Sequence, residues 1–150
     1  MTHEAKVVKF TAVQEFGRPI HPAMARGQIE GGSAQGIGWA LLEHVVMKDG
    51  VMANAQLTNY VIPTTLDTPQ LQSLIVESID PEGPYGAKEA GEGPLHPSVP
   101  AIANAIHDAL GIRCDRLPFS PPEVLRLLQA GDARAAWTQA RAALEGRARC

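Results

Sequence analysis

Residues 27–38 have the sequence Gly-Gln-Ile-Glu-Gly-Gly-Ser-Ala-Gln-Gly-Ile-Gly and decide how the rest of the chain is interpreted. Apolar residues recur around this stretch at helical spacing: Ile29, Ile37, Leu41 and Val45. This pattern predicts a helix over residues 23–47. Each glycine inside such a helix costs roughly 0.8–1 kcal/mol relative to alanine. The run of glycines therefore has one of two reasons: close packing against a sheet, or close approach of a ligand or another backbone.

Strands are predicted on both sides of this helix. Residues 6–16 are rich in β-branched and aromatic types with partial alternation, and residues 71–78 show a second pattern of this kind. Asp49-Gly50 is a turn signal, after which residues 51–62 form one strand or two short ones. Strands, then loops, then helices in this order predict an α+β fold, a mixed sheet with packed helices, rather than a regular βαβ array.

Helices are predicted in the C-terminal part. Residues 99–110 carry an apolar face, and Gly111 is placed to end that helix. Residues 120–123, Ser-Pro-Pro-Glu, form a capping box that opens a helix through Gln129. An alanine-rich helix is predicted over residues 132–145, with Trp137 and Leu144 on one face. We therefore expect one domain over residues 1–131 and a helical extension over residues 132–150.

The segment 80–100 contains five prolines and four glycines, and neither helical nor strand periodicity survives in it. A stretch of this kind inside a compact domain is usually functional or disordered, and the structured segments on both sides favour function. Glu92 lies between Gly91 and Gly93 in this loop, and Lys88 and Glu89 are close by. A carboxylate held in a rigid loop suits a general base, although a solvated loop without a chemical role has the same composition.

Gln28 is a second candidate, because glycines near a helix start leave backbone N–H groups free to hold a polar ligand. Its side-chain amide offers both donors and an acceptor. A plain glycine-tolerant helix entry is the alternative explanation. The segment is neither a dinucleotide fingerprint nor a phosphate loop, since no G-x-G-x-x-G follows a strand and no G-K-[ST] is present.

Several function classes are not expected from the composition. The net charge is −3 and the pI is about 5.9, so nucleic acid is not an expected partner. No apolar run is long enough for a membrane span, and no secretory signal precedes residue 6. Two cysteines, Cys114 and Cys150, cannot supply a four-thiolate iron–sulfur cluster, and we expect no disulfide between them. These features predict a cytoplasmic protein.

No protein-only metal site is expected. The five histidines form no H-E-x-x-H or H-x-x-x-H pair, and we expect them to be surface or packing residues. A serine nucleophile is also not indicated, because the sequence lacks a G-x-S-x-G motif. A small standalone hydrolase is therefore not favoured.

Four motifs taken together resemble the large subunits of molybdenum hydroxylases. Residues 27–38 resemble the family's G-Q-[IV]-E-G-G…Q-G-[IL]-G stretch, and residues 86–92 resemble its G-[AS]-K-x-x-[GS]-E loop. Residues 100–106 resemble the helix that follows this loop, and residues 117–121 match L-P-[FLI]-[ST]-P near the family's C-terminus. The family includes xanthine dehydrogenase, aldehyde oxidases and carbon monoxide dehydrogenase. The form of the loop looks closest to the bacterial branch near 4-hydroxybenzoyl-CoA reductase.

The resemblance implies an oxidoreductase in which Glu92 is the catalytic base. Glu92 would take a proton from a hydroxyl ligand of molybdenum, and the metal would be held by a pterin dithiolene rather than by side chains. Gln28, Lys88 and Gly91 would lie alongside this cofactor, which is molybdopterin or its cytosine dinucleotide form. No iron–sulfur cluster or flavin is expected in this chain.

The resemblance also implies partners, because the family's molybdenum subunits are several times longer. The chain would share the cofactor with a partner chain that carries the remaining molybdenum-subunit segment, next to iron–sulfur and flavin subunits. Alone, it should be inactive. A non-catalytic remnant or interaction domain that keeps the fold is the alternative. Residues 132–150 have no counterpart in the resemblance and would cover exposed surface or mediate self-association, so a homo-oligomer is also considered.

Overall fold

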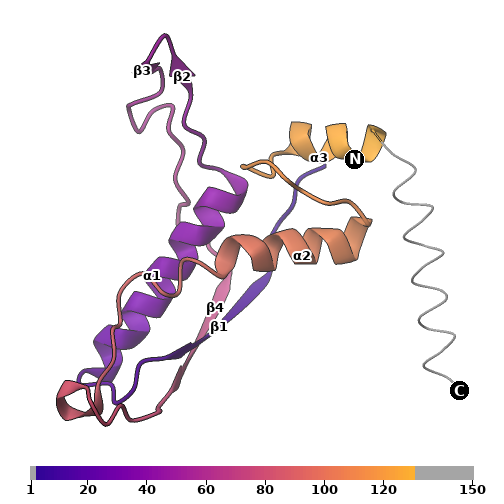
Figure 1. Ribbon diagram of the computed structural model, residues 1–150. Coiled ribbons are helices and arrows are strands. Elements are labelled where there is room, and N and C mark those ends of the chain that lie inside the picture. The colour runs from indigo at the N-terminus through magenta and orange to yellow at the C-terminus, as the bar shows by residue number, and fades with distance from the viewer. Residues whose placement is uncertain (1–2, 131–150) are drawn as a thin grey trace, which may run out of the picture.

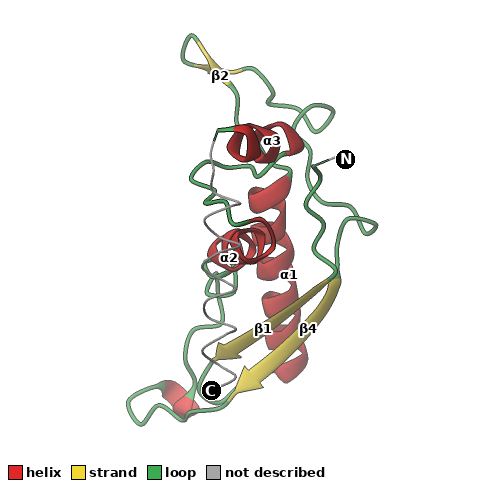
Figure 2. Ribbon diagram, turned by 90° about the vertical axis from the view of Figure 1, so that its right-hand side faces the viewer, coloured by secondary structure: helices red, strands yellow, loops and turns green. Residues whose placement is uncertain are grey.

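The computed structural model describes residues 3–130, and its central unit is a pair of parallel strands joined by a long helix (Figure 1). Strand β1 (Lys9–Glu15) pairs in parallel with β4 (Gln70–Val76), and helix α1 (Pro22–Leu41) lies between them in sequence. The alternating burial of both strands turns one face toward α1, as Figure 2 shows. The predicted strands at 6–16 and 71–78 are confirmed within a few residues.

Helix α1 ends at Leu41, so the prediction of a helix to residue 47 is wrong for its last six residues. The N–H groups of Leu42 and Glu43 both donate to the Gly38 carbonyl, at 2.8 Å each, which closes the helix. Pro63 packs directly over Gly38, at 2.7 Å from where a β-carbon would lie. Val45, which continues the apolar stripe in the sequence, consequently lies beyond the helix and is 54% exposed.

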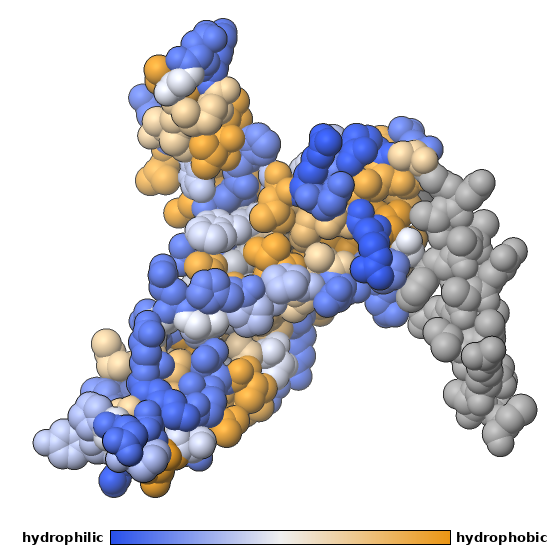
Figure 3. Space-filling view, viewed as in Figure 1, coloured by the Kyte–Doolittle hydropathy of each residue, from blue (hydrophilic) through white to orange (hydrophobic). Residues whose placement is uncertain are grey.

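A small hairpin follows α1. Strands β2 (Met47–Lys48) and β3 (Val51–Met52) pair antiparallel around Asp49 and Gly50, both with positive φ, which confirms the predicted turn. The rest of the predicted 51–62 strand region is loop. This arm projects from the end of α1 and exposes apolar side chains (Figure 3). They include Val45, Val46, Met47, Val51, Leu57, Val61 and Ile62.

The main core lies where α2 (Ser98–Leu110) and α3 (Pro121–Gln129) meet the second half of α1. Its buried members are Ile37, Ala40, Ile102, Ile106, Ile112, Phe119 and Val124. Gly111 ends α2 with a φ of 71°, as predicted. The N–H of Phe119 donates to the Ala40 carbonyl at 2.6 Å, which fastens the Leu-Pro-Phe-Ser-Pro motif to α1.

The predicted capping box at Ser120 is only partly formed. Helix α3 begins at Pro121, but the Ser120 side chain makes no capping hydrogen bond. Glu123 forms an ion pair with Arg126 one turn later, so its carboxylate does not reach back to the cap. The predicted helix over 132–145, Cys150 and the boundary at residue 131 lie outside the described residues or at their limit.

The predicted combination of strands with packed helices is confirmed. The strands do not form one mixed sheet, because the parallel pair and the antiparallel hairpin belong to separate two-stranded sheets. None of the helices within residues 3–130 is long and apolar enough to cross a membrane.

Candidate functional site

The site is built where the carboxyl ends of the two parallel strands meet, which is the edge where ligands bind in open parallel sheets. The loop after β1 and the loop after β4 are joined there by backbone hydrogen bonds. The N–H of Arg18 donates to the Gly86 carbonyl at 2.8 Å, and the N–H of Lys88 donates to the Phe16 carbonyl at 2.9 Å. Gly17 has a φ of 62°, and a β-carbon there would collide with the Gly86 carbonyl.

The proline- and glycine-rich loop is ordered by this contact. It contains a short 3-10 turn, η1 (Pro84–Gly86), in which Tyr85 has a φ of 58° and is 84% exposed. Ala90 then packs against a second core cluster, made of Phe16, Ala25 and Ile29. The loop is therefore fixed to both β1 and α1 on either side of Lys88.

A surface groove of about 270 Å³ brings Gln28 and Lys88 together. Gln28 comes from the second turn of α1, whereas Lys88 comes from the loop after β4, and Ala87 and Ala90 of that loop also line the groove. Arg18 adds a third side-chain donor to the same groove. Two of the predicted cofactor contacts thus share one surface, although they are distant in the sequence.

Lys88 is held by an ion pair with Glu15. Its Nζ lies 2.7 Å from a Glu15 carboxylate oxygen, and both side chains are 36% exposed. The other Glu15 oxygen accepts from the N–H groups of Gly17, at 2.5 Å, and Ser78, at 3.3 Å. The Lys88 ammonium first, and then these N–H groups, lower the pKa of Glu15 below its ordinary value. The ion pair sets where the Lys88 ammonium lies beside the groove.

Glu92 lies four residues beyond Lys88 and is exposed. Its carbonyl accepts from the Leu95 N–H at 3.0 Å, which forms a turn. Within residues 3–130, no hydrogen bond or ion pair engages its carboxylate. Neither Glu92 nor Gly91 lines the groove that holds Gln28 and Lys88. The atoms nearest to a β-carbon at Gly91 would belong to the Glu89 side chain, first its carboxylate, the far end of a flexible side chain.

Four of the five glycines of α1 fall into two groups. Gly32 and Gly36 allow the segment after Glu92 to lie on the helix, because β-carbons there would press on Pro94, at 3.1 Å, and on the Ser98 side chain. Gly27 and Gly31 have nothing within 4 Å of a would-be β-carbon. Close approach of another backbone thus explains the first group. The described fold gives no reason for the second.

Arg18, Glu15 and His21 are site-forming residues that the sequence analysis did not single out. His21 is an exposed residue that caps the start of α1, where its Nδ1 accepts from the Met24 N–H at 3.2 Å. Arg18 lies just after β1, between a glycine and a proline, and nothing in this local sequence indicates that it borders a groove. No group of three or more His, Cys, Asp or Glu side chains capable of holding a metal occurs within residues 3–130.

Comparisons with known proteins show which family the chain belongs to. The molybdopterin cofactor-binding domain model matches residues 1–69. The xanthine dehydrogenase molybdenum-binding subunit of Escherichia coli O157:H7 is 42% identical over 111 residues, which cover 73% of this chain and 15% of that protein. The chain belongs to the xanthine dehydrogenase and aldehyde oxidoreductase family of molybdenum-binding subunits.

Other members of the family also match most of this chain over a small part of their own length. The aldehyde oxidoreductase molybdenum-binding subunit of Escherichia coli K12 is 34% identical over 127 residues, or 83% of this chain and 17% of that protein. The crystal structure of quinoline 2-oxidoreductase from Pseudomonas putida 86 superposes with a TM-score of 0.77 at 35% identity, covering 83% of this chain and 16% of that one. The chain therefore spans about one sixth of its relatives and corresponds to a portion of a molybdenum-binding subunit. The closer resemblance to 4-hydroxybenzoyl-CoA reductase stays a prediction.

Proposed function

We propose that this chain supplies the catalytic base, Glu92, and part of the pterin-binding surface of a molybdenum-dependent oxidoreductase. The observation that supports this most directly is that Gln28 of α1 and Lys88 line one groove, and that the loop carrying Lys88 continues to Glu92. The groove lies at the carboxyl edge of the parallel strands, the usual place for a ligand in an open sheet.

The residues present fit a pterin cofactor. Gln28, Arg18 and Lys88 offer amide, guanidinium and ammonium donors, which suit the oxygen-rich, anionic groups of such a molecule. Gly27 and Gly31 leave open space on α1, the same helix that presents Gln28, so a planar group can come close to the helix backbone. Gln28 and Lys88 would hold the cofactor, with Gly91 beside it.

When bound, the cofactor supplies a Lewis-acidic, redox-active metal that takes up the electrons removed from the substrate. The chain's own residues would position the cofactor and accept a proton. Glu15 keeps Lys88 at the groove, and Gln28 donates from its amide. Because no other group engages the Glu92 carboxylate in the described residues, it is available to accept a proton at a carboxylate oxygen.

The proposal also covers the form of the cofactor, the other subunits and the cellular compartment. The cofactor is molybdopterin or its cytosine dinucleotide form, shared with the remaining segment of a molybdenum-binding subunit. Iron–sulfur and flavin groups reside on other subunits, and the assembly works in the cytoplasm, where two cysteines stay reduced. The relatives are named as subunits, which supports an assembly of several chains.

A graft tests the proposal. The 127-residue matching stretch of the E. coli aldehyde oxidoreductase subunit is replaced by the corresponding stretch of this chain, and molybdenum content and aldehyde turnover are measured. We expect the graft to retain molybdenum, and Gln28→Ala to lower its content while the exposed neighbour Arg26→Ala leaves it unchanged. A folded graft that holds no molybdenum would favour the alternative, a non-catalytic domain that keeps the fold.

A further inference from the structure

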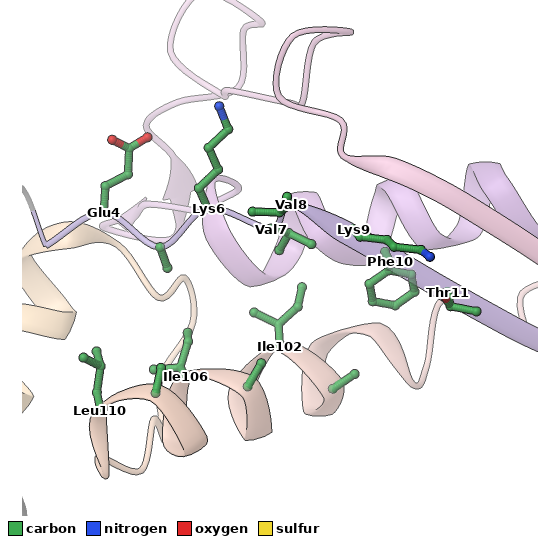
Figure 4. Close-up of a pocket in the computed structure, with 14 residues that line it drawn as sticks. Glu4, Lys6, Val7, Val8, Lys9, Phe10, Thr11, Ile102, Ile106 and Leu110 are labelled. Carbon is green, nitrogen blue, oxygen red and sulfur yellow. The ribbon is translucent and has the colours of Figure 1, made fainter.

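Two grooves of the described residues differ in their charge. The larger groove, of about 630 Å³, lies between residues 4–11 and α2 and is lined by charged side chains of both signs. Figure 4 shows two of them, Glu4 and Lys6, both pointing away from α2. The groove of the candidate site is lined by two cationic residues, Arg18 and Lys88, and by no acidic one. Its lining therefore carries charge of one sign, which suits an anionic group of a ligand.

The charge of Lys88 is balanced within the protein. Its Nζ lies 2.7 Å from the Glu15 carboxylate. Lys88 first, and then the N–H groups of Gly17 and Ser78, lower the pKa of Glu15, so this carboxylate is ionised at neutral pH. An anion that approached the Lys88 ammonium would meet the negative charge of Glu15 beside it. Lys88 thus has N–H donors left for uncharged acceptors, but little net charge for an anion.

The charge of Arg18 is not balanced in this way. Arg18 is exposed, and within residues 3–130 none of the ion pairs involves its guanidinium. No acidic side chain lines the groove with it. A guanidinium presents its N–H donors in a planar fork that matches two oxygens of a phosphate. Arg18 is therefore the residue of this groove that is best suited to an anionic group.

The backbone around Arg18 is fixed on both sides. Gly17 is buried, has a φ of 62° and forms a bridge with Ala87. The N–H of Arg18 donates to the Gly86 carbonyl at 2.8 Å, and Pro19 restricts the backbone that follows. The Arg18 side chain thus starts from a fixed point beside the loop after β4, so less conformational freedom is lost when it binds a ligand.

We propose that Arg18 binds the phosphate group of the pterin cofactor, while Lys88, paired with Glu15, binds uncharged acceptors of the same molecule. The inference rests on the proposed function for the identity of the ligand. Both forms of the cofactor carry phosphate, molybdopterin as a monoester and the cytosine dinucleotide form as a pyrophosphate. Arginine pairs strongly with phosphate oxygens, because two parallel N–H bonds form at once. Arg18 is then a cofactor-binding residue in addition to Gln28, Lys88 and Gly91.

Binding of two small anions to the full chain tests the role of Arg18 without molybdenum. Inorganic phosphate and pyrophosphate are titrated into the chain at low ionic strength, and dissociation constants are obtained from the shifts of its backbone amide signals in NMR spectra. Arg18→Gln should weaken the binding of pyrophosphate by at least about tenfold, because charge-assisted hydrogen bonds are lost. Arg26→Gln, the same change at an exposed position of α1 outside the groove, should leave binding within about twofold of the original.

The ion pair leads to a second prediction of opposite sign. Glu15→Gln removes the charge that balances Lys88, so pyrophosphate should bind more tightly to this variant than to the unmodified chain. Lys88→Gln should weaken binding less than Arg18→Gln does, because the charge of Lys88 is already balanced. In the grafted subunit, Arg18→Gln should lower the molybdenum content, because the phosphate of the cofactor loses its partner.

Several results would overturn the inference. One is pyrophosphate binding that Arg18→Gln leaves unchanged, and another is no binding of either anion by the unmodified chain. A larger loss in Lys88→Gln than in Arg18→Gln, or weaker binding in Glu15→Gln, would contradict the division of charge between the two cations. A graft that holds molybdenum while Arg18→Gln changes neither readout would contradict this inference alone. A graft without molybdenum, from a chain whose pyrophosphate binding depends on Arg18, would contradict the proposed function alone.

Discussion

The Glu15–Lys88 ion pair links the end of β1 to the loop after β4, and its stability depends on pH. The pKa of Glu15 is lowered in the folded chain, chiefly by Lys88. Its stabilising contribution is thus complete above the ordinary carboxyl pKa of 4.5 and is lost as the pH falls through the lowered value.

We therefore expect Glu15→Gln to unfold at a lower temperature than the unmodified chain at pH 7. The gap should close as the solution is acidified below the pKa of Glu15. Thermal unfolding, followed by circular dichroism at a series of pH values from 7 downward, measures this difference in unfolding temperature. Glu89→Gln is the control, because no hydrogen bond or ion pair engages Glu89 in the described residues. A gap that persists unchanged in acid would show that Glu15 acts through packing alone.

The two groups of glycines in α1 should respond to alanine in opposite ways. Gly31→Ala should stabilise the chain by about 1 kcal/mol, because it removes helix-interior glycine and meets no neighbour. Gly36→Ala should destabilise it, because the β-carbon collides with Ser98. Urea unfolding of the two variants measures both effects.

The Gly31→Ala substitution should affect cofactor binding and folding stability in opposite directions. If a cofactor approaches α1 there, the stabilised Gly31→Ala variant loses molybdenum when placed in the grafted subunit. The control is Arg26→Ala, a change at an exposed position on the same helix. Full molybdenum content in Gly31→Ala would mean that the open space beside this glycine has no role in cofactor binding.

At the scale of elements, the Leu-Pro-Phe-Ser-Pro motif (residues 117–121) holds the segment before α3 against α1, and we call this contact the clamp. Phe119 is 3% exposed within the main core, and its N–H bonds to Ala40. Phe119→Ala should lower the free energy of unfolding by about 3–5 kcal/mol, because it leaves a cavity between α1 and α3. Leu117→Ala, at a position 46% exposed, should cost much less. Equal losses in denaturant unfolding would contradict the clamp.

Local sequence patterns predicted most of the helices and strands, because the residues that determine each of them are close together in the sequence. The alternation of residue types predicted β1 and β4, and Gly111 predicted the end of α2. The end of α1 was mispredicted, because the apolar stripe continues to Val45 while Pro63, distant in sequence, packs over Gly38. The Glu123 half of the predicted capping box does not form, because the Glu123 carboxylate pairs with Arg126.

The candidate site was predictable only in part, for a similar reason. The family motifs identified Gln28, Lys88, Gly91 and Glu92 as positions of interest. That Gln28 and Lys88 share a groove depends on the parallel pairing of β1 with β4, which no single segment encodes. The roles of Arg18 and Glu15 follow from the same pairing.

At the scale of the molecule, the described residues have surfaces that a single small chain rarely leaves open. The hairpin arm exposes apolar side chains, β1 has an unpaired edge, and the groove with Gln28 faces outward. Large exposed apolar areas mark interaction sites. These surfaces agree with a segment that completes its site together with the rest of a molybdenum-binding subunit.

Turnover by Glu92→Gln in the grafted subunit tests the central claim most directly, with molybdenum measured on the same sample. The amide keeps the size of the side chain but cannot accept the proton. We predict that kcat falls by at least about 10²-fold with molybdenum retained, while Glu89→Gln in the same loop stays near the unmodified graft. Unchanged turnover in Glu92→Gln would remove this residue from the mechanism and contradict the account.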